Sequence, residues 1–160
     1  MAHTPGNEVV DGSASTVVRS APIEVFDAIA DIERMGEWSP ECVGCSWVSP
    51  ATGPTVGARF EGHNAAKLGP ITLKKWSTMS EVTACIPGQV FEFITESHST
   101  WRYEFAKHAD GTVVTESFSY PQYVGKERFL YETLGRRSKT MVGAVEATLA
   151  RIKMSVEGQR

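Results

Sequence analysis

The chain has 160 residues and a mass of 17.5 kDa, which is the size of one ordinary domain. Its composition, 41% hydrophobic and 22% charged, is that of a globular protein and excludes a disordered or low-complexity chain. The formal net charge of −3 argues against a dedicated nucleic-acid binder, because such proteins need a strongly basic surface. No window reaches the ~18 consecutive apolar residues of a membrane span, and the N-terminus lacks the features of a secretion signal. We therefore expect a cytoplasmic protein without stable membrane insertion.

The first part of the chain predicts a tail, a strand and two short helices. Residues 1–8 are polar, so we expect a flexible tail ahead of one domain over residues 9–160. Valines separated by small polar residues predict a first strand within residues 9–20. Pro22 suits the first turn of a helix, and a second helical turn must stop within residues 36–40, where glycine and proline occur.

Between Cys42 and Tyr120 the hydrophobic period falls from 3.6 towards 2, which predicts a run of strands. Turn signals divide this run at residues 51–54, 69–70, 87–88 and 110–111. Aromatic residues occupy one pleat face and polar residues the other, as in an antiparallel sheet with one face covered. The aromatic residues with the inward parity are Phe60, Phe91, Phe93, Trp101, Tyr103, Phe105 and Phe118.

The residues that follow Pro121 predict one long C-terminal helix. From Lys126 to Val156, apolar residues keep helical spacing, and this helix would cover the aromatic face of the sheet. Residues 126–160 hold eight Lys and Arg against four Glu, a pattern that we interpret as a solvated helix face. The predicted fold class is therefore α+β, with helices on one side of an antiparallel sheet of about seven strands.

Seven short strings in this order resemble the START-like or SRPBCC superfamily, in its bacterial polyketide cyclase/dehydrase-like branch. They lie at residues 21–26, 32–40, 57–64, 76–78, 87–93, 101–105 and 111–117. The resemblance covers about residues 8–157. It implies the helix-grip fold, in which a curved sheet wraps around the long C-terminal helix and leaves an apolar cavity for lipids, polyketides, hormones or aromatic compounds.

Pleat parity and this resemblance together predict which residues line the cavity. They are Trp38, Phe60, Asn64, Trp76, Phe91, Phe93, Trp101, Tyr103, Phe105, Glu116, Phe118, Tyr120, Arg137, Met141 and Val145. For the tryptophans a plain core role has equal weight. Arg137 shares the helix stripe of Met141, so we expect it at the cavity mouth, where it could bind an anionic head group.

Glu116 stands out because its parity places a carboxyl group among apolar residues. It either lines the cavity, pairs with an Arg or Tyr as a structural partner, or faces outward through a shifted register. Its protonation state is not fixed by the sequence, since burial favours the neutral acid and a nearby cation would favour the charged form.

Two functions of different classes follow. The leading hypothesis is binding or carriage of one lipid-like or polyketide-like molecule, and the alternative is a cofactor-independent polyketide cyclase or dehydratase that uses Arg59, Tyr103 and Glu116. An interaction module with an unused cavity is a third, weaker hypothesis. The motifs of hydrolases, NTPases, nicotinamide enzymes and zincins do not occur, so we expect no cofactor and no metal. The expected partner is an apolar small molecule, nucleic acid is not expected, and a homodimer is left open.

Cysteine and histidine carry no clear catalytic pattern. Three cysteines do not make a disulfide scaffold, and the C-x-x-C at Cys42–Cys45 lacks both a helix N-terminus and a second ligand pair. We therefore expect two structural thiols in a reducing compartment. His63, His98 and His108 are expected on the surface, with His63 and His98 on strands.

Overall fold

One antiparallel sheet of seven strands organises the molecule. The strands are β1 (Val9–Val18), β2 (Cys42–Trp47), β3 (Arg59–Leu68), β4 (Ile71–Ile86), β5 (Val90–Thr95), β6 (Thr100–His108) and β7 (Gly111–Pro121). Their order in the sheet is β1-β7-β6-β5-β4-β3-β2, so every neighbouring pair except β1 and β7 is consecutive in the chain. This computed structural model describes residues 9–121 and 137–159, and the predicted tail at residues 1–8 lies outside that range.

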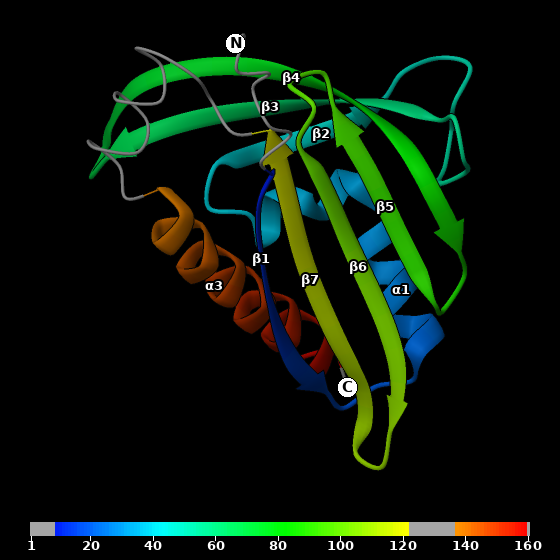
Figure 1. Cartoon of the computed structure of the whole chain (residues 1–160). Helices are drawn as coiled ribbons and strands as arrows, with labels where there is room; N and C mark the ends of the chain where they lie inside the picture. Colours follow the sequence, from blue (N-terminus) through cyan, green and yellow to red (C-terminus); the bar gives the residue numbers. More distant parts are fainter. Residues whose placement is uncertain (1–8, 122–136, 160) are drawn as a thin grey trace, which may run out of the picture.

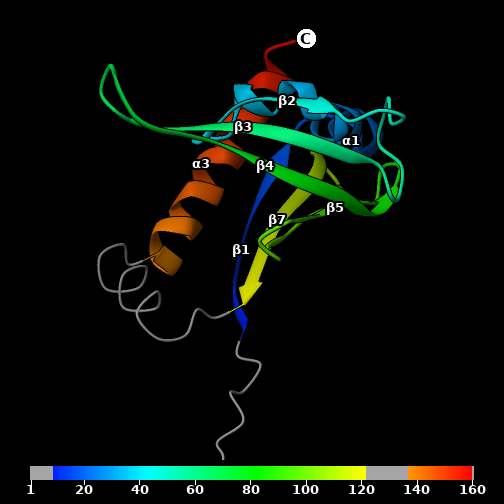
Figure 2. The same ribbon diagram turned by 90° about the horizontal axis from the view of Figure 1, so that it is seen from above.

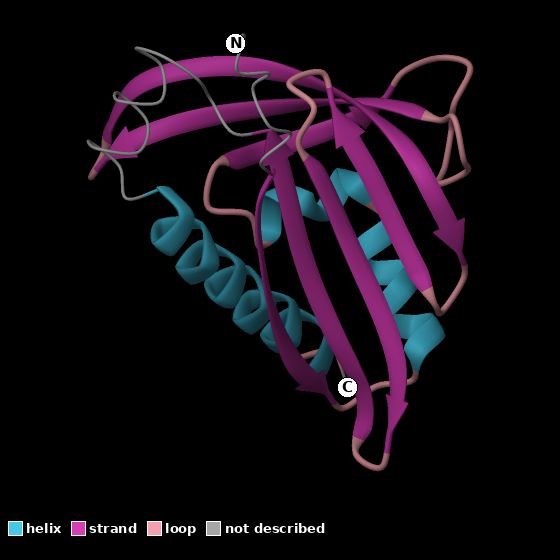
Figure 3. Cartoon of the chain, in the orientation of Figure 1, coloured by secondary structure: helices cyan, strands magenta, loops and turns pink. Residues whose placement is uncertain are grey.

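Within the described residues, three helical elements lie on one side of this sheet (Figures 1 and 3). They are α1 (Pro22–Ala30), the 3₁₀ helix η1 (Ile32–Glu37) and α3 (Arg137–Glu157). Figure 2 shows α3 running alongside β1, against which it packs. The arrangement is the helix-grip fold predicted from the sequence, with seven strands and two short helices after the first strand. The predicted helical stretch at residues 126–136 lies outside the described residues.

Helix α3 buries one stripe, as its spacing predicted. Val145, Leu149, Ile152 and Val156 are all buried, and they recur every three or four residues along the helix. Among the residues that the structure describes, no helix combines the length and the hydropathy needed to cross a bilayer.

Close approach of α3 to β1 depends on Gly12. A Cβ atom at this position would lie 2.7 Å from Phe118 Cζ and 3.1 Å from Val142 Cγ2, so a side chain has no room there. At its C-terminal end, α3 is tied to the turn after β1, where Glu157 Oε1 accepts hydrogen bonds from the Arg19 backbone N–H at 2.9 Å and from Lys153 Nζ at 2.7 Å. The helix is therefore fixed to the edge strand along its described length.

The turn between β6 and β7 needs glycine. Gly111 has a φ of +138°, and a Cβ atom there would collide with the carbonyl oxygen of Val18. Strand β7 then pairs with β6 on one side and with β1 on the other. The Asp110-Gly111 signal in the sequence thus fixes the register of the strand that carries Glu116.

Candidate functional site

A tyrosine and a glutamate form a buried polar pair on the inner face of the sheet. Tyr103 on β6 and Glu116 on β7 are directly opposite each other in the ladder. The Tyr103 hydroxyl donates a hydrogen bond to Glu116 Oε1 at 2.8 Å. Both residues are almost fully buried, with 4% and 2% of their surface exposed. Of the three placements that the sequence left open for Glu116, the structure excludes the outward one.

The electrostatics of this pair favour a neutral carboxyl group. Burial raises the pKa of Glu116 to about 8, and the hydrogen bond from Tyr103 offsets only part of that rise. Burial also raises the pKa of Tyr103, and the adjacent carboxylate charge raises it further. At pH 7 we therefore expect Glu116 to be mainly protonated and Tyr103 to keep its proton.

The second carboxyl oxygen is what makes the pair a candidate site. Among the described residues, Glu116 Oε2 has no hydrogen-bond partner although it is buried. A buried polar atom without a partner is costly and rare in folded proteins. Since Oε1 accepts from Tyr103, the acidic proton belongs on Oε2, where it can be donated to an acceptor atom.

Aromatic rings surround this pair on the same face. Phe91 is the ladder partner of Tyr103 on β5, and Phe118 follows Glu116 two residues along β7. The rings contact one another: Phe60 with Phe93 at 5.1 Å between centroids, Phe118 with Tyr120 at 6.2 Å, and Trp101 with Phe118 at 5.8 Å. Phe26 of α1 adds edge contacts with Phe91 and Phe105 to this face.

The helix side of the predicted cavity is described in part. Val145 is buried and Met141 is half-buried, both on α3. Val142, which the sequence analysis did not select, approaches β1 at Gly12. The side chain of Arg137 lies outside the described residues, so its place at a cavity mouth stays a prediction.

Four other predicted site residues lie apart from Glu116. The grouping of Arg59 with Tyr103 and Glu116 is wrong. Arg59 is exposed and adjoins the inward-facing Phe60, so its side chain points to the opposite side of the sheet and cannot act with that pair. Asn64 and Trp76 face each other on β3 and β4 and are half-buried, with Asn64 Nδ2 donating to Thr78 Oγ1 at 3.1 Å.

Trp38 is the fourth of these residues, and it packs in the core at the end of η1. It is 1% exposed. The Arg34 guanidinium lies 5.5 Å from the centre of its ring, and Arg151 Nη1 of α3 donates to its backbone oxygen at 3.1 Å. These contacts fit a core role for Trp38, which the sequence left open beside a cavity-lining role.

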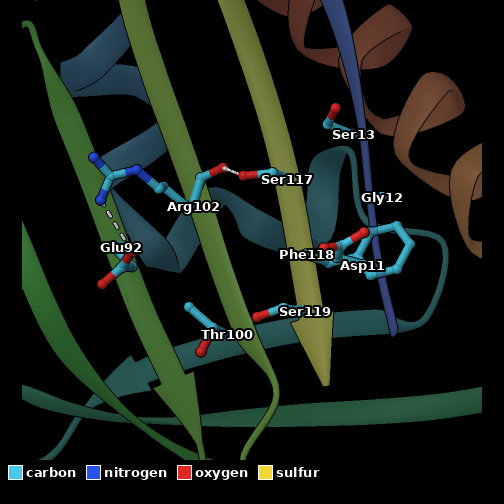
Figure 4. Close-up of a pocket in the computed structure, with 9 residues that line it drawn as sticks. All are labelled: Asp11, Gly12, Ser13, Glu92, Thr100, Arg102, Ser117, Phe118 and Ser119. Carbon is cyan, nitrogen blue, oxygen red and sulfur yellow. Dashed lines mark hydrogen bonds and ion pairs between the residues drawn. The ribbon is translucent and has the colours of Figure 1, made fainter. Parts of the chain in front are cut away.

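The two best-formed hollows among the described residues do not lie between the aromatic face and α3. One, of about 520 Å³, borders the β3–β4 hairpin and includes Asn64 and Trp76. The other, of about 430 Å³, lies mainly on the outer face (Figure 4) and is lined by Asp11, Gly12, Ser13, Glu92, Thr100, Arg102, Ser117, Phe118 and Ser119. Arg102 is the cation of this second hollow, and it is already bound to Glu92 at 3.0 Å and to Glu104 at 3.2 Å. The outer hollow is thus polar and internally paired, unlike a site for an apolar ligand.

Three histidines are on the surface, as expected. His63, His98 and His108 are all exposed. His98 lies in the turn between β5 and β6 and not on a strand, where its φ of 61° reflects the tight reversal of the chain. Within residues 9–121 and 137–159 no group of three or more His, Cys, Asp or Glu could hold a metal ion.

The fold and this aromatic face with one buried acid define a helix-grip domain of the kind that the sequence resembles. The chain belongs to the family described as polyketide cyclase / dehydrase and lipid transport, whose model matches residues 10–157. This places it in the START-like or SRPBCC superfamily. No curated protein sequence matches the chain significantly.

Solved structures support the same fold. A polyketide cyclase-like protein from Corynebacterium glutamicum is 26% identical, with a TM-score of 0.64 over 98% of this chain and 95% of that one. A protein of unknown function from Staphylococcus aureus is 11% identical, with a TM-score of 0.70 over 96% of both chains. The di-domain ARO/CYC StfQ of the steffimycin pathway is 14% identical, with a TM-score of 0.70 over 94% of this chain and 51% of its own. The last two likenesses show the fold alone.

Proposed function

We propose that the protein binds and carries an apolar small molecule, lipid-like or polyketide-like, on the inner face of the sheet. The observation that carries this proposal is the buried Glu116 Oε2, which lacks a partner among the described residues and lies on an aromatic face. A protonated Oε2 would donate a hydrogen bond to a neutral acceptor such as a ketone or ester carbonyl. The ligand would then have an apolar body and one carbonyl oxygen near Glu116.

The family supports this proposal at the level of ligand class. Its description joins polyketide chemistry with lipid transport, and both involve largely apolar molecules. The aromatic rings from Phe60 to Tyr120 supply the apolar contact surface, and the Tyr103–Glu116 pair supplies one polar point that can fix the orientation.

Native mass spectrometry of the purified protein gives the first test. We expect a co-purified small molecule that is lost on denaturation. A second test compares 2-undecanone with undecane as competitors of the neutral dye N-phenyl-1-naphthylamine. Replacing Glu116 by Leu removes the donor, so the preference for the ketone should fall by roughly three- to tenfold, which is the value of one hydrogen bond.

Two variants serve as controls for this comparison. Glu116→Gln keeps a donor of similar shape and should keep most of the preference for the ketone. Glu104→Leu alters an exposed carboxylate on the same strand as Tyr103 and should change nothing. A ketone preference that is equal in the wild type and in Glu116→Leu would contradict the role given to Glu116, and failure of any apolar molecule to bind would contradict the proposal itself.

One observation also favours a second function, catalysis of polyketide cyclisation. The pKa of Glu116, about 8, lies close to neutral pH, as the pKa of a general acid or base should. Tyr103 is in direct contact with Glu116. Ring closure of a linear poly-β-ketone should then proceed faster with the protein than in buffer. Acceleration that is lost in Glu116→Gln, with dye binding intact, would show that the protein is an enzyme that uses Glu116. No acceleration would leave the carrier function.

A further inference from the structure

We propose that Cys42 and Cys45 are an oxidation site, where the two thiols close reversibly into an intramolecular disulfide. The sequence pattern predicted two structural thiols here, and the function proposed above does not depend on them. The inference rests on how β2 places the two sulfur atoms.

A bulge in β2 brings the two side chains together. On a regular strand, residues three apart point to opposite faces and lie roughly 10 Å apart. In β2, Cys42 pairs with Asn64 and Gly44 pairs with His63, so the chain advances two residues on β2 for one on β3. Because of this extra residue, the side chains of Cys42 and Cys45 point to the same face of the sheet, and the distance between them along the strand is shorter. As a result, the Sγ atoms of Cys42 and Cys45 lie 3.2 Å apart.

The surroundings make one of the two thiols the more reactive. The hydrogen bond from the Cys45 thiol lowers the pKa of Cys42 to about 7, although burial opposes this effect. The same contact raises the pKa of Cys45, as does burial. Cys42 is therefore partly a thiolate at neutral pH, and the thiolate is the form that reacts with oxidants. Cys42 is buried, so a small oxidant such as hydrogen peroxide suits it better than a bulky disulfide.

The oxidation balances with peroxide as the named oxidant. The Cys42 thiolate attacks one peroxide oxygen, so an S–O bond forms, the O–O bond breaks and the other oxygen leaves as hydroxide, which takes up a proton to become water. The Cys45 sulfur then attacks Cys42 Sγ, so the S–S bond forms, the S–O bond breaks and the second oxygen leaves as water with the Cys45 proton. Two thiols thus lose two protons and two electrons, and one peroxide becomes two waters.

Cys85 provides an internal control. It lies on β4, where its thiol contacts the Pro54 carbonyl oxygen at 3.2 Å, and burial raises its pKa. It should therefore react slowly with peroxide. Met35 supplies a third sulfur near the pair, with its Sδ 3.8 Å from Cys45 Sγ. Two thiols and a thioether could instead suit a soft metal ion, which makes metal binding an outcome to be distinguished.

The test is intact-mass analysis of the folded full chain after brief peroxide treatment and alkylation with iodoacetamide. We expect a loss of 2 Da, one alkylated cysteine, mapping of that label to Cys85, and three labels after reduction with dithiothreitol. Cys85→Ser should keep the loss of 2 Da, whereas Cys42→Ser and Cys45→Ser should each abolish it. The wild-type measurement stands even if a variant does not fold.

Four results would overturn the proposal. They are three free thiols after treatment, oxidation of Cys42 beyond the sulfenic acid while Cys45 stays free, a disulfide that includes Cys85 or a second chain, and one stoichiometric metal ion that is released when Cys42 and Cys45 are alkylated.

Discussion

Glu116 links the chemistry of the candidate site to the stability of the fold. Its pKa is raised from the ordinary value of 4.5 to about 8 in the folded chain because it is buried. Between these two pH values the folded state holds a proton that the unfolded state has lost. The stabilising effect of that proton is fully present below about pH 4.5 and is lost as the pH rises through 8.

Glu116→Gln should remove this pH dependence. From pH 5 to pH 8, the wild type should lose stability relative to the variant by up to roughly 1.4 kcal/mol per pH unit, since glutamine does not titrate. Urea denaturation at several pH values measures this difference, and Glu104→Gln on the exposed face is the matched control. A constant difference across the pH range would mean that Glu116 is already ionised in the folded protein.

Gly12 is a second residue whose replacement should destabilise the fold, because no side chain fits at its position. Gly12→Ala should destabilise the protein by about 1–3 kcal/mol, because the new Cβ would press on Phe118 and Val142. Thermal and urea denaturation measure the loss. Gly44→Ala, where a Cβ would meet nothing within 4 Å, should cost clearly less. Equal losses in the two variants would show that α3 can move away from β1 at little cost.

At the scale of the elements, helix α3 carries a weakness that can be repaired. Gly143 lies within the helix and is exposed, and a Cβ atom at this position would meet nothing within 4 Å. Gly143→Ala should therefore raise the free energy of unfolding by about 0.5–1 kcal/mol through helix propensity alone. Urea denaturation tests this. Gly143→Ser gains less helix propensity, so its free energy of unfolding should lie between those of the wild type and Gly143→Ala. A destabilised Gly143→Ala would indicate that another surface packs closely there.

The elements were predictable because their signals are local. Alternation indicated the strands. Glycine and proline pairs indicated the turns between β2 and β3, β3 and β4, and β4 and β5, and Asp110-Gly111 indicated the turn between β6 and β7. Parity alone placed Glu116 and Tyr103 on one face, and the structure adds that they are ladder partners. In the β6–β7 hairpin the short turn sets the register, whereas the register between β1 and β7 joins segments far apart in the chain and is not contained in sequence spacing.

Two errors have different causes. Arg59 was grouped with Glu116 by residue type, although its parity beside Phe60 already pointed outward. The thiol pair was missed because the bulge in β2 is a property of the pairing with β3, and without it Cys42 and Cys45 would point to opposite faces. Pairing between strands therefore decided the second case, whereas in the first the local alternation was correct and residue type was given more weight.

At the scale of the whole molecule, β1 holds together the two ends of the described chain. It pairs with β7 along its full length and packs against α3. A chain that begins at residue 19 should lose its cooperative unfolding transition, because β7 and the apolar stripe of α3 would both be uncovered. Adding a synthetic peptide of residues 9–18 should restore the transition in a concentration-dependent way, as circular dichroism would report. A truncated chain that melts like the full chain would contradict this role.

The pairing of β1 with β7 also has a consequence for the order of events during synthesis. Ser15 and Thr115 share a hydrogen bond across this pair, yet they are 100 residues apart in the chain. At a rate of 5–20 residues per second, β1 leaves the ribosome roughly 5–20 s before β7 does. The consecutive hairpins from β2 to β7 can form as they emerge, whereas the first strand waits for almost the last one. Substitutions in β1 or α3 should therefore reduce the yield of folded chains in the cell by more than their effect on the finished molecule suggests.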